Sequence, residues 1–137
     1  MKAQQVCWFE IPVVFIDRAI KFYSSILSVK IEKKLLLDTY YGVFDKKIHQ
    51  IGGVLVEKKG YSPGKGTVLF FCVVDLSDVL KKAIELNGKI VIPKTLIKQT
   101  NNKGETIVAT NLIDENIGYY AEIVDSEGNH VGLYANS

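Results

Sequence analysis

The feature that most constrains this chain is a strand followed by a helix, a segment that occurs twice. Residues 6–13 are β-branched and aromatic, which favours a strand, and apolar residues then recur at helical spacing from about Ile16 to Leu27. About sixty residues later, a strand-like run over residues 67–74 is followed by Asp75, a good helix N-cap, and a second helical stripe. Each half therefore predicts the order strand, helix, strand, strand, strand.

A half of this size cannot bury both faces of its own sheet. We therefore predict an α+β fold in which two βαβββ modules form one curved mixed sheet, a cup, with the helices outside. The polar, Gly- and Pro-containing stretch at residues 57–66 is the expected linker. The prediction is a single domain over residues 1–137, with module one at about 5–58 and module two at about 67–136.

Composition restricts the classes of partner. The 17 basic and 15 acidic residues are interspersed without a basic stripe, which argues against nucleic acid. No apolar run approaches the roughly 20 residues of a membrane span, and the first residues lack an apolar signal region. Cys7 and Cys72 lie in apolar, strand-like runs, which predicts buried free thiols. We expect a cytoplasmic protein with neither a nucleic-acid nor a membrane partner.

The first strand has two different faces. Alternation places Cys7, Phe9, Ile11 and Val13 on an apolar face suited to a covering helix, and Trp8, Glu10 and Pro12 on the other face. A carboxylate in a strand lies either at a solvated surface or in a cavity, and the sequence leaves both open for Glu10.

Several phrases occur together in the order of a known family. FEIPV at residues 9–13 and RAIKFY at 18–23 resemble the opening of the vicinal oxygen chelate superfamily, which includes glyoxalase I, bleomycin-resistance proteins and extradiol dioxygenases. IGGVLV at 51–56 and DSEGNHVGL at 125–133 resemble its module endings. The resemblance covers nearly the whole chain, is greatest to small bacterial glyoxalase-related members, and implies the paired-module cup and a homodimer.

The same resemblance implies positions for a divalent metal, which the enzymes of the family hold with His and Glu side chains on four strands. The matching positions are Trp8, Leu69, Gly132 and the neighbourhood of Gly53, none of which offers a lone pair. We therefore expect no cofactor and no metal at these positions. An atypical metal site from Glu10, Glu122 and His130 stays open, whereas His49 reads as a solvated turn residue.

The resemblance also implies which residues line the concave face of the cup. The expected ligand-binding residues are Trp8, Glu10, Leu69, Phe71, Tyr120, His130 and Tyr134. Trp8 would stack on a planar ligand or fill the cup as core, and Glu10 would serve as a general base in a dry cavity or form ordinary hydrogen bonds. Glu10 and His130 are the candidate catalytic residues.

The sequence thus predicts a metal-free protein of the glyoxalase and bleomycin-resistance type that binds a small, planar or amphipathic molecule in an aromatic-lined cup. The alternative is a metal-dependent lyase, isomerase or dioxygenase of the same superfamily with atypical ligands. A third reading is an interaction module with a filled cup. Whether the chain is an enzyme stays open, because this fold hosts several chemistries.

Overall fold

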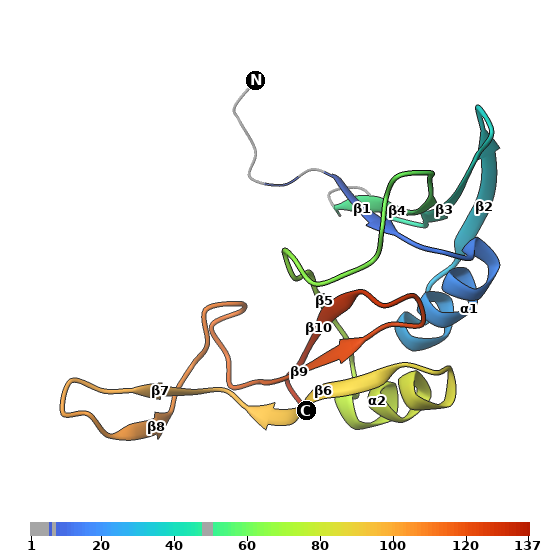
Figure 1. The fold of residues 1–137 in the computed structure, drawn as a ribbon. Coiled ribbons are helices and arrows are strands. Elements are labelled where there is room, and N and C mark those ends of the chain that lie inside the picture. Colours follow the sequence, from blue (N-terminus) through green and yellow to red (C-terminus); the bar gives the residue numbers. More distant parts are fainter. Residues whose placement is uncertain (1–5, 7, 48–50) are drawn as a thin grey trace. The chain divides into compact units, whose positions relative to one another are not determined.

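The computed structural model describes residue 6, residues 8–47 and residues 51–137. The predictions for Cys7 and His49 lie outside these residues. The chain forms two compact units (Figure 1). The first unit extends to Lys65 and also contains Ser126–Asn129, and the second contains Gly66–Asp125 and His130–Ser137.

The first unit is a four-stranded mixed sheet with one helix. Its elements are β1 (Trp8–Pro12), α1 (Ile16–Leu27), β2 (Ile31–Leu36), β3 (Thr39–Phe44) and β4 (Gly52–Glu57). The strand order is β1-β4-β3-β2, in which β1 and β4 run parallel and the other neighbours run antiparallel. β1 and β2 are therefore the two edges of the sheet.

The second unit repeats this arrangement and adds a hairpin. Its elements are β5 (Phe70–Cys72), α2 (Leu76–Glu85), β6 (Lys89–Leu96), β7 (Lys98–Thr100), β8 (Thr106–Val108), β9 (Tyr119–Val124) and β10 (His130–Ala135). The main sheet has the order β5-β10-β9-β6, and β7 and β8 form a separate two-stranded sheet that projects from the end of β6 (Figure 1). The predicted α+β class with two βαβββ modules is confirmed.

The core of the first unit lies between α1 and one face of its sheet. Most of the apolar stripe of α1 is buried, as its spacing predicted, through Ile16, Ala19, Phe22, Tyr23 and Ile26. Phe44 packs edge-on against Phe9 and Tyr23, with ring centroids 5.3 Å and 6.1 Å apart. The predicted division of β1 holds, because Phe9, Ile11 and Val13 share this helix-covered side.

The N-terminus of α1 is capped by two carboxylates from distant parts of the chain. Phe15 occupies the N-cap position and has no capping side chain. Glu127 Oε1 instead accepts hydrogen bonds from the N–H groups of Val14 and Phe15 at 2.9 and 2.8 Å, and Glu57 Oε2 accepts from the N–H of Ile16 at 2.7 Å. These carboxylates satisfy donors that the first helical turn leaves without partners, and they suit the positive end of the helix dipole.

Arg18 holds Glu127 in this capping position. Its Nε donates to Glu127 Oε2 at 2.6 Å, while Ser126 Oγ donates to the same oxygen at 3.0 Å. Burial raises the pKa of the Glu127 carboxyl, but the hydrogen bonds from Arg18, the Phe15 N–H, Ser126 and the Val14 N–H outweigh this and hold the pKa below its ordinary value. The turn 126–129 therefore completes the first unit.

In the second unit α2 packs on its sheet through its own apolar stripe. Leu76, Val79, Leu80 and Ala83 are buried. The Asp75 carboxylate accepts a hydrogen bond from the Asp78 N–H at 3.1 Å, so the predicted N-cap is confirmed.

Cys72 is a free thiol, but it is exposed on the edge strand β5, so the prediction that it is buried was wrong. No helix in the described part of the chain has the length and apolar character needed to cross a membrane.

Candidate functional site

Aromatic rings cover strand glycines at matching places in the two units. In the first unit Trp8 pairs with Gly52 and Phe9 with Gly53, and in the second unit Phe70 pairs with Gly132. A methyl group added at any of these glycines would overlap the ring of its partner. The close backbone approach that the Gly52–Gly53 pair allows is therefore used by the chain's own aromatic side chains.

A hollow of about 330 Å³ lies against the sheet of the first unit. Trp8 of β1 lines one part of it, and Lys30, Glu32, Val43, Phe44, Asp45 and Lys46 line the rest. Gly52 and Val43 lie on β4 and β3, between the edge strands β1 and β2, and neither carries a large side chain.

Trp8 is 47% exposed, so it is not a core plug. Its indole lies over Gly52 beside the aliphatic part of Lys46. The charged side chains of Lys30, Glu32, Asp45 and Lys46 form no ion pair within the part of the chain that the structure describes. The hollow thus combines an aromatic wall with charges of both signs that are available to a ligand.

Glu10 lies on the same face of β1 as Trp8, as alternation predicted. Its register partner is Val54 of β4, and its side chain is exposed. A general base with the predicted properties requires a dry cavity. The exposed position of Glu10 favours the other reading, in which this carboxylate lies at a solvated surface.

The second unit places Phe70, rather than Leu69 and Phe71, with the predicted site residues. Phe70 pairs with Gly132, which pairs with Glu122, whereas Phe71 pairs with the buried Leu133. By strand alternation, Phe71 and the preceding Leu69 therefore lie on the face opposite to Phe70 and Gly132.

His130 and Glu122 form a pair on this face of the second unit. His130 Nδ1 lies 3.5 Å from Glu122 Oε1, and the side chains are only 22% and 16% exposed. The Nδ1 atom is buried and makes no hydrogen bond with any described residue. An imidazole and a carboxylate are the side chains that general acid–base chemistry most often uses, and here both lie on one face of the sheet. Tyr120 lies on the same face, in register with Tyr134.

Tyr134 is engaged in a hydrogen-bond network of its own unit. It is 2% exposed; its hydroxyl donates to Asp114 Oδ1 at 2.6 Å and accepts from Asn111 Nδ2 at 2.7 Å. Burial, then the hydrogen bond to Asp114, raises the pKa of Tyr134, and the same bond lowers the pKa of Asp114. The geometry gives Tyr134 a structural role in holding the 111–118 segment.

The residues at the family's metal positions do not fit a divalent ion. Trp8, Leu69, Gly53 and Gly132 carry no nitrogen or oxygen lone pair suited to such an ion. At Gly132 the ring of Phe70 occupies the space that a liganding side chain would need, and a side chain at Gly53 would point to the helix-covered side against Phe9. No three His, Cys, Asp or Glu side chains among the described residues gather into a group that could hold a metal.

These features define a two-module α+β protein with a hollow beside Trp8 on the sheet of its first unit. No protein-family model matches the chain, and no curated protein matches its sequence. Solved structures match closely in fold. One is TnmS3, an antibiotic-binding protein from Streptomyces sp. CB03234, with 19% identity, a TM-score of 0.62, and coverage of 100% of this chain and 99% of that one.

Two further solved structures with a similar fold have names that belong to this superfamily. A glyoxalase/bleomycin resistance protein/dioxygenase superfamily member from Sphaerobacter thermophilus is 17% identical, with a TM-score of 0.65 and coverage of 97% and 98%. The V278E mutant of glyoxalase I from Zea mays is 19% identical, with a TM-score of 0.66 and coverage of 95% of this chain and 45% of that one. The chain thus spans about half of the maize enzyme. The resemblance to the vicinal oxygen chelate superfamily is confirmed at the level of the fold.

Proposed function

We propose that this chain is a small-molecule-binding protein that holds a planar or amphipathic ligand in the hollow beside Trp8 without a metal. The observation that carries the proposal is the open space of about 330 Å³ between an aromatic wall and charges of both signs. The antibiotic-binding protein of the same fold supports the reading, because its length matches that of this chain.

Trp8 makes the proposal directly testable, since it is the only tryptophan in the chain. Its emission reports on the hollow without a label. Titration with aromatic metabolites and antibiotics should give a saturable change in emission and a higher melting temperature. A ligand at 100 times its Kd stabilises the folded state by about 2.7 kcal/mol.

A variant can separate binding from a general surface effect. Val43→Phe should fill the hollow and abolish the titration while leaving Trp8 in place. Ile84→Phe, on the exposed side of α2, is the matched control and should bind as the wild type does. If no compound in a broad panel changes either the emission or the melting temperature, the proposed function is refuted.

The second candidate is an enzyme, and the His130–Glu122 pair is the observation that favours it. The pair could move a proton at a ligand bound on the face of the second unit. His130→Gln should then abolish turnover of a bound compound while leaving the melting temperature close to that of the wild type. Elemental analysis and assays with added Ni, Zn, Mn or Fe test the metal-dependent lyase, isomerase and dioxygenase alternatives.

We also propose that the protein acts as a cytoplasmic homodimer. The free, exposed thiol of Cys72 is compatible with a reducing compartment. Large apolar side chains that remain exposed in both units support self-association. Analytical ultracentrifugation of the purified chain and fractionation of the producing cell test these two statements.

A further inference from the structure

One side of the hollow beside Trp8 carries more carboxylates than ammonium groups. Lys30 directly precedes β2, Glu32 lies within it, and Asp45 directly follows β3. The Asp45 N–H donates a hydrogen bond to the Lys30 carbonyl oxygen at 2.9 Å, so these two residues are neighbours across the hairpin. Glu32 pairs with Val43, two residues before Asp45. Two carboxylates and one ammonium group therefore share this side, here called the acidic wall.

The aromatic wall on the other side consists of Trp8 and Lys46, which meet above Gly52. A methyl carbon added at Gly52 would lie 2.6 Å from Lys46 Cδ and 2.9 Å from Trp8 Cζ3. The aliphatic part of Lys46 therefore lies close to the indole, as long charged side chains do on apolar surfaces. Lys46 thus places an ammonium group at the aromatic wall.

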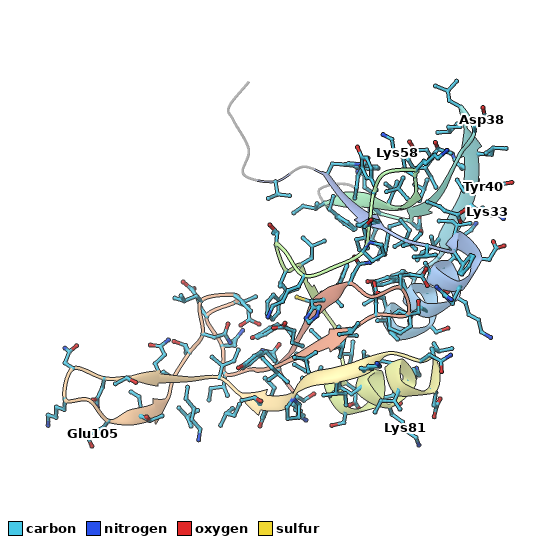
Figure 2. All side chains as sticks on the ribbon, in the orientation of Figure 1. Lys33, Asp38, Tyr40, Lys58, Lys81 and Glu105 are labelled. Atoms are coloured by element: carbon cyan, nitrogen blue, oxygen red, sulfur yellow. The ribbon has the colours of Figure 1, made fainter. Side chains whose placement is uncertain are left out.

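The four charged side chains of the hollow form no ion pair with a residue that the structure describes. The neighbouring Lys33 does not neutralise Glu32, because it belongs to the other face of the sheet. Its Nζ lies 2.9 Å from Asp17 Oδ1 of α1 and 4.6 Å from the centre of the Tyr40 ring. Figure 2 shows Lys33 and Tyr40 together near α1. The charges of the hollow are therefore available to a ligand.

The two walls differ in net charge at neutral pH. The acidic wall has an excess of negative charge, whereas the aromatic wall carries the positive charge of Lys46. By strand alternation, Glu10 and Lys34 are further charges on this face of the sheet, but neither lines the hollow. A ligand in the hollow thus meets a positive group beside an aromatic ring and a negative surface on the other side.

This arrangement selects against ligands that carry a single charge. A ligand that is only an anion is repelled by the acidic wall, and a ligand that is only a cation leaves Lys46 without a partner. Complementary charges determine which ligand a site prefers more than they determine how tightly it binds. A ligand with both charges on one ring matches both walls.

We propose that the hollow selects a planar zwitterion. Its ring lies against Trp8, its anionic group faces Lys46, and its ammonium group faces Glu32 and Asp45. This inference rests on the proposed function, because it names the class of ligand for the same hollow.

Four compounds built on one benzene ring test the selection. The zwitterion is para-aminomethylbenzoate, the anion is para-methylbenzoate, the cation is para-methylbenzylamine, and the neutral reference is para-methylbenzyl alcohol. Calorimetric titration of the full chain at neutral pH and low salt should rank the zwitterion first. Its affinity should exceed that of either singly charged compound about fivefold, because an exposed pair of charges contributes modestly. Added salt should reduce this difference.

Substitutions that remove charge assign each group of the ligand to its wall. Lys46→Met keeps an aliphatic chain above Gly52, so it should lower the affinity for the zwitterion about fivefold and should not lower that for the cation. Glu32→Gln combined with Asp45→Asn should reduce the affinity for the zwitterion to that for the anion. Lys34→Met, on the same strand as Glu32 but outside the hollow, is the matched control and should keep the wild-type ranking. All four side chains are exposed, so circular dichroism should show an unchanged fold.

The inference fails, and the proposed function stands, if other compounds titrate Trp8 emission but the zwitterion does not bind. The same conclusion follows if the zwitterion binds no more tightly than a singly charged compound, or if Lys46→Met leaves the ranking unchanged. A broad panel in which no compound changes Trp8 emission or the melting temperature removes the proposed function and this inference together.

Discussion

Glu127→Ala is the most informative perturbation of the first unit, because it removes one side chain that serves three groups. Glu127 accepts hydrogen bonds from the N–H groups of Val14 and Phe15 and from Arg18, and its side chain is completely buried. A hydrogen bond to a charged group contributes about 1.5–3 kcal/mol. Loss of two such bonds, with donors of α1 left unpaired, should lower the free energy of unfolding by about 3–5 kcal/mol.

Because the Arg18 side chain is half-exposed, it contributes less than Glu127 to the free energy of unfolding. Solvent screens the ion pair, so Arg18→Ala should lower the free energy of unfolding by only about 1 kcal/mol. Glu127→Gln keeps one oxygen acceptor and should fall between the two. The three variants together separate the capping of α1 from the ion pair.

Urea unfolding followed by Trp8 emission measures these changes, because Trp8 lies in the unit that Glu127 completes. Glu105→Ala, at an exposed position between β7 and β8, is the control and should stay within about 0.5 kcal/mol of the wild type. A Glu127→Ala variant within about 1 kcal/mol of the wild type would refute the argument that this carboxylate caps α1 at substantial energy.

Three more predictions follow from individual contacts. The folded-state pKa of Glu127 lies below the unfolded value of about 4.5, so its stabilising contribution is complete above that pH and should be lost as the pH falls through the folded-state pKa; acid titration of the wild type should show this loss, and Glu127→Gln should not. Gly53→Ala should be more destabilising than Gly132→Ala, by about 1–3 kcal/mol, because Phe9 is wedged against Phe44 whereas Phe70 is half-exposed and can turn away; urea midpoints compare them, and equal effects would contradict the reasoning. Tyr134→Phe should cost about 1–3 kcal/mol, because it removes the hydroxyl that accepts from Asn111 Nδ2 and donates to Asp114, and an unchanged melting temperature would exclude this role.

The fold was predictable because its signals are local and occur twice. Helical spacing identified the buried stripes of α1 and α2, Asp75 identified a helix start, and alternation identified the two faces of β1. Each of these depends on residues close together in sequence. The repeat then supplied the topology, because two copies of one pattern must fold in the same way.

The site was less predictable, because its geometry depends on strand register and on contacts between residues that are far apart in the sequence. A register difference of one residue decides whether Phe70 or Phe71 shares a face with Gly132, because side chains alternate along a strand. Glu127 lies 112 residues from Phe15, so no local pattern marks it as the cap of α1. Burial of Cys72 was predicted from its apolar neighbours, but β5 is an edge strand with only one neighbour in its sheet.

The aromatic rings over the strand glycines tie each glycine to its ring as one unit of substitution. Replacing Gly132 with a histidine or glutamate would drive the new side chain into Phe70, and a side chain at Gly53 would enter the helix-covered side against Phe9. Shortening the ring alone would leave bare backbone beneath it. A change at either glycine is therefore tolerated only together with a change of its ring, whereas the exposed face of Trp8 carries no such constraint.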